Sequence, residues 1–363
     1  MIYLICFFLS SLTLSLSVKR QSEWVRSILF VISIAILVIL ATIRSPEVGI
    51  DVRVYVAPYC KIALNSISFL SYLAYILSIG VEPGYAILNY VGAKLGGGLS
   101  GVFALIAIFS ILPVYARLYE IREKAPVFVS SMLYMLLFYN LSLNLSRQAI
   151  ALAIVFWGTK YLDKNKFKFC ICVILAMLFH NSAIIGGMIL IIACTIKGTL
   201  THLKKVIVFI GVLIGIVFYN PILSFILSNV FSNAEKYLNA FLESETGYLS
   251  IWNILFKLLN SVLVIVGYKY LKSKVENYIF FIMIIIFDFM LYFLNAYNGN
   301  CFRYGLYFTI FIPMILTSLR NAFEESGKVF FDIFLLMIYI FYWYNFNIIS
   351  DSYGTLPYCI YQY

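Results

Sequence analysis

Four short segments combine arginine, histidine or a carboxylate with small or polar neighbours at the edge of an apolar stretch. They are TIRSPEVGIDVRVY (residues 42–55), NLSRQAIALAI (144–154), FHNSA (179–183) and NGNCFRYGLYF (298–308). A guanidinium group binds phosphate oxygens through parallel hydrogen bonds, and a histidine or carboxylate can accept a proton near neutral pH. Together these residue types indicate binding of an anionic substrate and transfer of a proton.

The first segment places five chemically active side chains close together, namely Arg44, Glu47, Asp51, Arg53 and Tyr55. The simpler interpretation is an interfacial loop with one internal Arg–Asp pair, which contributes only about 0–1 kcal/mol when exposed. The functional interpretation is the rim of a binding site that also supplies an acidic group. The sequence leaves both interpretations open.

The second segment begins an apolar helix with Arg147 and Gln148. A cation at a helix N-terminus lies at the unfavourable end of the helix dipole. The same end attracts anions, because free backbone N–H groups point outward there. The segment therefore predicts a phosphate site, and the alternative is an arginine that reaches the lipid headgroups.

The third segment contains His180, followed by Asn181 and Ser182, at the end of an apolar helix. Histidine changes its charge near pH 6.5, which suits proton transfer. A lone histidine at a helix end is also commonly structural, so catalysis is one of two hypotheses.

The fourth segment carries Arg303 and Tyr304 into an apolar span after a Gly-Asn turn. Tyr304 and Tyr307 share one helical face, where tyrosines stack on sugars or, more commonly, pack in a core. Asp288 lies inside the preceding apolar span, where a charge is costly, so we expect it to face the interior, paired or protonated.

The composition defines the class of protein that must position these residues. The chain has 363 residues, of which 63% are hydrophobic and 12% charged, with a mean hydropathy of +0.97. This leaves too little polar surface for a water-soluble globule, and we predict an all-α polytopic membrane protein that forms one integral membrane domain over residues 1–363. About twelve spans are predicted, near residues 2–18, 27–43, 100–118, 126–141, 147–162, 169–180, 182–196, 206–219, 251–271, 278–295, 301–319 and 329–348.

The loops between these spans alternate in charge. Eighteen of the 26 cations lie on one side, which is therefore predicted to be cytoplasmic, with both termini on the opposite, outer side. They are Lys19, Arg20, Arg26, Arg117, Arg122, Lys124, Lys160, Lys164, Lys166, Lys168, Lys197, Lys204, Lys205, Lys269, Lys272, Lys274, Arg320 and Lys328. Four arginines remain on the predicted outer side, namely Arg44, Arg53, Arg147 and Arg303. Because cations are uncommon there, we expect these arginines to bind an anionic group.

Two outer segments are too long for simple hairpins, residues 44–99 and 220–250. The first contains an apolar stretch (67–79) that ends at Gly80, and then a helix that begins at Glu82-Pro83 and ends at three glycines (96–98). We expect re-entrant or interfacial helices in both segments.

The order of these motifs resembles the EpsG-like branch of the Wzy-type polymerases of bacterial surface polysaccharides. The motifs that carry the resemblance are GIDVRVY, EPGYAILNYVGAKLG, NLSRQAIALAI, FHNSA, FRYG and GTLPY. Arg44, Gly49, Asp51 and Tyr55 match the residue types of a segment in this family. Arg53 is an addition, and its role is more doubtful than that of Arg44.

The resemblance implies a glycosyltransferase of GT-C-like architecture at the outer face of the bacterial cytoplasmic (inner) membrane. Such an enzyme moves the growing glycan from undecaprenyl pyrophosphate to the non-reducing end of an incoming lipid-linked repeat unit. This chemistry needs a base near the acceptor hydroxyl and cations on the leaving group. The roles that follow are pyrophosphate binding by Arg147, Arg303, Arg44 and Gln148, catalysis by His180 or Asp51 with Glu82 third, and sugar contacts by Tyr55, Asn144, Asn181 and Tyr304.

The implied reaction needs no cofactor, and no acidic cluster suited to Mg²⁺ or Mn²⁺ is visible, so metal-independent transfer is expected. The implied partners are undecaprenyl-pyrophosphate-linked oligosaccharides and membrane lipids, with a chain-length regulator and the repeat-unit flippase, and no nucleic acid. The alternatives are a lipid-linked oligosaccharide flippase and an O-antigen ligase. A flippase would carry charges midway along its helices, whereas these lie at the outer ends. The pathway (O-antigen, capsule or exopolysaccharide) stays open.

Overall fold

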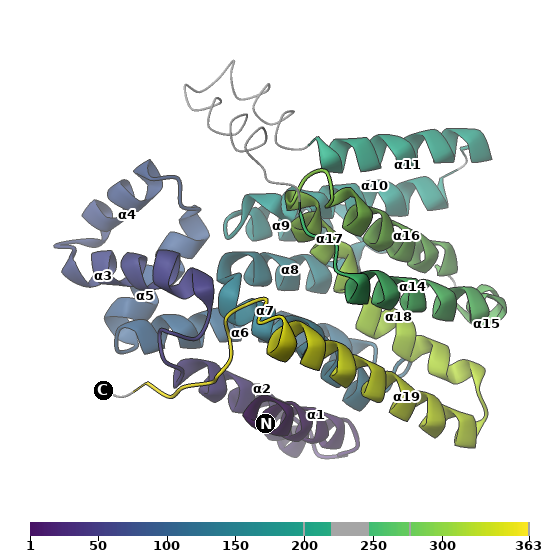
Figure 1. The fold of residues 1–363 in the computed structure, drawn as a ribbon, viewed down its shortest axis with the longest axis horizontal. Helices are drawn as coiled ribbons and strands as arrows, with labels where there is room; N and C mark the ends of the chain where they lie inside the picture. Colours follow the sequence, from purple (N-terminus) through teal and green to yellow (C-terminus); the bar gives the residue numbers. More distant parts are fainter. Residues whose placement is uncertain (199, 219–246, 276, 362–363) are drawn as a thin grey trace. The chain divides into compact units, whose positions relative to one another are not determined.

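The computed structural model describes residues 1–198, 200–218, 247–275 and 277–361, and the regular structure of this part is helical (Figure 1). The chain divides into two compact units. Unit 1 comprises Met1–Ala183 and Phe323–Tyr363, and unit 2 comprises Ile184–Ala322. Most of the predicted outer segment 220–250 lies outside the described residues.

Seven helices outside segment 44–99 belong to the described part of unit 1, with α7 at their centre. They are α1 (Ile2–Val18), α2 (Glu23–Thr42), α6 (Leu99–Glu120), α7 (Val127–Asn144), α8 (Ser146–Gly158), α9 (Lys166–Met177) and α19 (Glu325–Tyr344). Helix α7 contacts α1, α6, α8 and α19 and is buried along nearly its whole length. A helix that is buried on all sides is the core of its unit, so polar groups on α7 need partners inside the protein.

Four described helical segments are long and apolar enough to cross a membrane, namely α2, α6, α7 and α19 with the turn that follows it. Two bent pairs raise this number to six if each pair is one span. They are α14 (Ile251–Val266) with α15 (Tyr268–Lys274), and α17 (Asn300–Thr309) with α18 (Ile312–Leu319) and its last turn. The all-helical polytopic class is therefore supported. Each of the twelve predicted spans overlaps a helix or a helix pair, but several are short, and the count of twelve and the orientation of the termini stay predictions.

Unit 2 contains, in addition to those two pairs, α10 (Ile185–Lys197), α11 (His202–Val217) and α16 (Tyr278–Leu294). Asp288 on α16 is buried and accepts hydrogen bonds from Lys257 of α14 and Thr309 of α17. The prediction that Asp288 faces the interior and is paired is confirmed. A lone charge is costly inside an apolar unit. The contacts of Asp288 with Lys257 and Thr309 therefore help to hold α14, α16 and α17 together.

The predicted outer segment 44–99 forms a π-helical turn, η1 (Val52–Val56), and three helices, α3 (Ala57–Asn65), α4 (Phe69–Ser78) and α5 (Pro83–Leu95). The predicted helix boundaries are confirmed. The apolar stretch ends at Gly80, Glu82 is the N-cap of α5, Pro83 is its first residue, and the glycine run follows its end. Helix α5 packs on α6 and on α3, which fixes the position of Glu82 at the edge of unit 1.

After α19 and a second π-helical turn, η5 (Asn345–Ile349), the chain runs back to the segment that follows α2 (Figure 1). Arg44 and Ile360 form an antiparallel bridge there. The first and last parts of the chain therefore meet beside the outer segment.

Candidate functional site

An ion pair joins the N-termini of α8 and α5. Arg147 Nη1 donates a hydrogen bond to Glu82 Oε2 over 2.7 Å, and the side chains are only 25% and 9% exposed. The carboxylate at the start of α5 is well placed against the positive end of that helix. The arginine at the start of α8 is held by its partner, so its charge is balanced despite the unfavourable helix end.

Two tyrosine rings flank the Arg147 guanidinium. Its central carbon lies 5.4 Å from the ring centre of Tyr55 and 5.8 Å from that of Tyr85. The Tyr55 ring is 39% exposed, whereas Tyr85 is buried. Burial raises the pKa of Tyr85, so its phenol stays protonated. Cation–π contacts of this kind hold a guanidinium without fully neutralising it.

Tyr85 was not among the predicted site residues. The sequence nevertheless pointed to this residue, because Tyr85 is the last residue of EPGY, which begins one of the motifs that carry the family resemblance. The tyrosine follows the N-cap of α5 by three residues, which places its ring over the same helix end as Glu82.

The start of α5 rests on the end of α9. The N–H groups of Gly84 and Tyr85 both donate to the Leu178 carbonyl, at 2.8 and 3.3 Å. A Cβ on Gly84 would lie 2.8 Å from this oxygen, which is closer than real contacts allow, so glycine is required. The EPGY motif thus contacts the residue that directly precedes the FHNSA motif.

His180, two residues after Leu178, makes a local ring contact. Its Nδ1 lies 2.7 Å from Ser182 Oγ and accepts the backbone N–H of Ser182 at 3.2 Å. In neutral imidazole this arrangement assigns the proton to Nε2. A general base that uses Nε2 would first have to change its tautomer, so the geometry favours a role of His180 in closing this turn. Asn181 begins the adjacent turn η3 (Asn181–Ile184).

Arg44 is the most deeply buried arginine of the proposed site. It is 1% exposed, and its guanidinium carbon lies 4.1 Å from the ring centre of Phe103 on α6. Burial lowers the pKa of Arg44 to about 10, partly offset by nearby tyrosines, so the group stays charged at neutral pH. A buried charge without a counter-ion is costly, and an anionic ligand would remove that cost.

Several buried polar atoms near these arginines lack a hydrogen-bond partner of good geometry. They are Nε and Nη1 of Arg44, the Tyr85 hydroxyl, both amide atoms of Asn89 and Ser146 Oγ. Tyr85 is close enough to both Arg44 and Arg147 to interact with them electrostatically. Buried polar groups are almost always satisfied by protein, water or ligand. Their concentration here, in the described part of the chain, indicates that a polar ligand or water belongs between them.

The loop with Asp51 lies on the end of α7. The Asp51 N–H donates to Asn144 Oδ1 over 2.7 Å. Gly49 has φ of +106°, and a Cβ there would lie 2.8 Å from the Leu143 carbonyl oxygen. The predicted sugar ligand Asn144 therefore positions the acidic loop in this structure.

Arg53 makes an ion pair with Glu47. The two charged groups are 2.5 Å apart and more than half exposed. An exposed pair contributes only about 0–1 kcal/mol. This geometry agrees with the hypothesis that Arg53 is a loop residue.

Arg303 and Tyr304 belong to unit 2, on α17. Tyr304 and Tyr307 are buried, which favours core packing, whereas Arg303 is exposed. The start of α17 is held by Asn295 Oδ1, which accepts the Phe302 N–H at 3.3 Å. Of the eleven predicted site residues, the structure groups nine in unit 1: Arg44, Asp51, Tyr55, Glu82, Asn144, Arg147, Gln148, His180 and Asn181.

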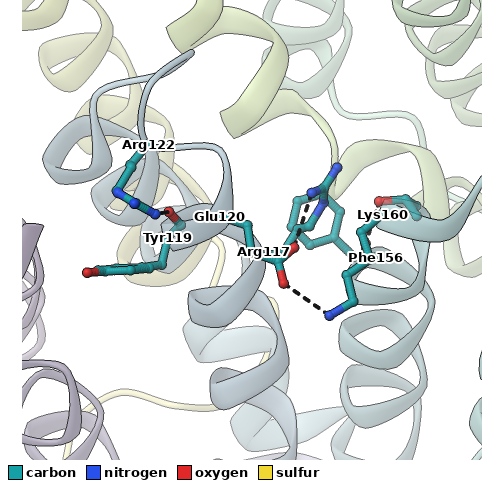
Figure 2. Close-up of polar contacts among 7 residues, drawn as sticks. Arg117, Tyr119, Glu120, Arg122, Phe156 and Lys160 are labelled. Carbon is teal, nitrogen blue, oxygen red and sulfur yellow. Dashed lines mark hydrogen bonds and ion pairs between the residues drawn. The ribbon is translucent and has the colours of Figure 1, made fainter. Parts of the chain in front are cut away.

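A second cluster lies at the opposite end of α8, where the turn η2 (Thr159–Tyr161) follows the helix. Figure 2 shows Glu120 of α6 between Arg117, at 3.3 Å, and Lys160, at 3.0 Å. The Lys160 ammonium also lies 3.7 Å from the centre of the Trp157 ring. These cations are among those predicted to be cytoplasmic.

Among the described residues, no group of three or more His, Cys, Asp or Glu side chains is arranged to hold a metal ion.

A family model described as "EpsG family" matches residues 27–360, which is nearly the whole chain. No curated protein and no solved structure gave a significant match. The matched range includes every residue placed in the candidate site.

Proposed function

The chain belongs to the EpsG family of membrane proteins, and from this premise we propose that it is a polysaccharide polymerase. In the proposed reaction, the growing glycan moves from undecaprenyl pyrophosphate to the non-reducing end of an incoming lipid-linked repeat unit. The family match supports polymerase-type activity in general, and the lipid pyrophosphate donor is the specific part of the proposal.

The observation that carries this proposal is the Arg147–Glu82 pair between two tyrosine rings. The pyrophosphate of the donor carries more negative charge than one carboxylate, so it competes with Glu82 for Arg147. The guanidinium can bind two phosphate oxygens at once, and free N–H groups at the start of α8 add to this site. Arg44, which is buried without a counter-ion among the described residues, is the second cation, and Gln148 is the third proposed ligand in unit 1. Arg303, which lies in unit 2, stays a pyrophosphate ligand predicted from the sequence.

The proposed competition between pyrophosphate and Glu82 for Arg147 also provides a carboxylate that can act as the base. In the proposed step the acceptor hydroxyl oxygen bonds to the anomeric carbon, and the bond from that carbon to the pyrophosphate oxygen breaks. The electron pair leaves with undecaprenyl pyrophosphate, and the hydroxyl proton goes to a carboxylate. Glu82 is the first candidate, because displacement from Arg147 frees its carboxylate to accept a proton at the reacting centre. Asp51 and His180 are the alternatives, and the proposed sugar contacts in unit 1 are Tyr55, Asn144 and Asn181. Tyr304, which is buried in unit 2, stays a sugar contact predicted from the sequence.

We further propose twelve spans, with both termini and the helices α3–α5 on the outer side of the cytoplasmic membrane. The charge distribution supports this orientation. Helix α8 has the Arg147 pair at one end and the Lys160 cluster at the other, and cations gather at cytoplasmic helix ends. The candidate site then faces the compartment that receives flipped repeat units.

The test uses purified full-length protein in lipid vesicles with a synthetic undecaprenyl-pyrophosphate repeat unit. We expect a ladder of glycans that differ by one repeat unit. The absence of a ladder together with movement of the lipid across the bilayer would support the flippase instead. Transfer of a single unit to an acceptor without a polyprenyl chain would support the ligase.

A further inference from the structure

The last residues of the chain are paired with the loop that carries Arg44 and Asp51. The Ser45 N–H donates to the Cys359 carbonyl at 2.8 Å, and the Tyr361 N–H donates to the Ile43 carbonyl at 2.8 Å. Further along, the Gly49 N–H donates to the Gly354 carbonyl at 2.8 Å. Residues 44–49 form no helix of their own, so the tail supplies much of the backbone pairing that fixes this loop.

Two asparagines of α7 hold the tail and the loop side by side. Asn140 Nδ2 donates to Thr355 Oγ1 over 2.8 Å, and Asn144 Oδ1 accepts the Asp51 N–H at 2.7 Å. Residues four apart lie on one face of a helix. Because Gly354 precedes Thr355 and pairs with Gly49, the contacts close a ring from α7 through the tail to the loop and back.

The tail side of this ring is buried and further fixed. Thr355 is 1% exposed and Asn140 is 2% exposed. Trp343 Nε1 donates to Asn140 Oδ1 over 2.8 Å, and the Tyr3 hydroxyl donates to the Thr355 carbonyl over 2.8 Å. Asn140 thus has a partner for each end of its amide. A fully satisfied buried network favours one arrangement, because each displaced partner would leave another polar group unpaired.

We propose that Thr355 and Asn140 are positioning residues that hold the loop from Arg44 to Asp51 in its binding geometry through the C-terminal tail. The part of this inference that concerns catalysis rests on the proposed polymerase function. Neither residue touches the substrate in this proposal. They act by fixing where the buried Arg44 guanidinium and the Asp51 carboxylate lie.

The first experiment measures docking of the tail without any assay of activity. In a Ser45→Cys variant the new thiol faces the natural Cys359 across the paired segments, so mild oxidation is expected to form a disulfide in membranes. Adding Cys359→Ser removes the partner and controls for the other cysteines. Thr355→Val keeps the shape but removes the hydroxyl, and we expect it to lower the cross-linked fraction at least about threefold, since a buried hydrogen bond contributes roughly 1 kcal/mol. Thr355→Ser restores the hydroxyl and is expected to cross-link like the parent.

The second experiment measures polymerisation by the same tail variants with the natural Ser45. We expect Thr355→Val to lower kcat by about tenfold or more, because small displacements of catalytic groups are costly, with KM changed less than kcat. Thr355→Ser is expected to recover most of kcat, because it restores the hydroxyl that Asn140 contacts. If the parent protein makes no ladder, the proposed function fails, and the cross-linking result by itself decides whether the tail holds the loop. Full cross-linking of Thr355→Val together with parental kcat would overturn the inference.

Discussion

The two ends of helix α8 carry ion pairs of opposite character. At its start, Arg147 pairs with one carboxylate, Glu82, that is 9% exposed, and two tyrosine rings flank the guanidinium. At its end, Glu120 is 38% exposed and is shared by Arg117 and Lys160. The cations at the two ends are similarly covered, with Arg147 25% exposed and Arg117 and Lys160 18% and 21% exposed. The ends therefore differ in the burial of the carboxylate and in the excess of positive charge at the second end.

We interpret this difference as that between the proposed binding site and a membrane anchor. Lys160 packs its ammonium on Trp157, as side chains at a membrane surface commonly do. Because its carboxylate partner Glu120 is 38% exposed, we expect the ion pair of Lys160 to add little stability. The buried pair is different, because loss of one partner leaves an uncompensated charge, which costs about 3–5 kcal/mol. A charge kept in that environment, beside other buried polar atoms without partners, is better explained by an anionic ligand than by anchoring.

The largest expected effect is that of Arg147→Lys. This change keeps the charge but removes the planar fork that binds two phosphate oxygens. We expect at least about a 100-fold loss of polymerisation, comparable to the loss of one transition-state donor, with normal membrane insertion. The matched control is Arg117→Lys in the cluster at the opposite end of α8. We expect this variant to polymerise like the parent. Equal activity of the two variants would remove Arg147 from the site.

The next effect is that of Glu82→Gln. It removes the proposed base and the anion that competes with the substrate, so we expect about a 100-fold lower kcat but unchanged or tighter binding of a polyprenyl pyrophosphate. Binding is measured with the purified variant by titration calorimetry, and Glu120→Gln serves as the control. Weaker pyrophosphate binding by Glu82→Gln would show that the carboxylate holds Arg147 in place for the ligand and does not compete with it.

A smaller effect is expected at Tyr55. Tyr55→Ala removes a ring beside Arg147, and a cation–π contact contributes about 0.5–1 kcal/mol at partly exposed sites, so KM for the donor should rise roughly two- to fivefold. Tyr55→Phe keeps the ring and is expected to keep the parental KM. A loss in both variants would assign the role to the hydroxyl group.

At the opposite end of α8, Lys160→Gln should change little. We expect the free energy of unfolding to fall by less than about 1 kcal/mol, with polymerisation unchanged. Thermal denaturation in detergent and the ladder assay measure the two quantities. A large loss of activity would mean that the cation cluster is more than an anchor.

No effect is expected from metal chelation, because arginines rather than a cation bridge are proposed to bind the pyrophosphate. The ladder assay is repeated after dialysis against EDTA. Loss of activity that one divalent ion restores would contradict the proposed arginine site and assign the leaving-group charge to a metal.

Much of the architecture was predictable because its signals are local. Apolar stretches mark the helices, and Glu82-Pro83 and the glycine run mark the boundaries of α5, since capping depends on residues within one turn. The interior position of Asp288 followed from the cost of a charge in an apolar span. The order of the motifs also indicated the family that the comparison confirmed.

Partner choice depended on tertiary structure. An Arg–Asp pair was one interpretation of the outer loop, whereas Arg53 pairs with Glu47. Arg147 pairs with Glu82, which is 65 residues away in the sequence, and Asn140 bonds to Thr355, which is 215 residues away. The amino-acid sequence by itself determined the membrane class, the helices and the residue types of the site. The folded chain alone decided which charges meet, because helix formation is set within a few residues, whereas contacts between helices depend on how whole elements pack.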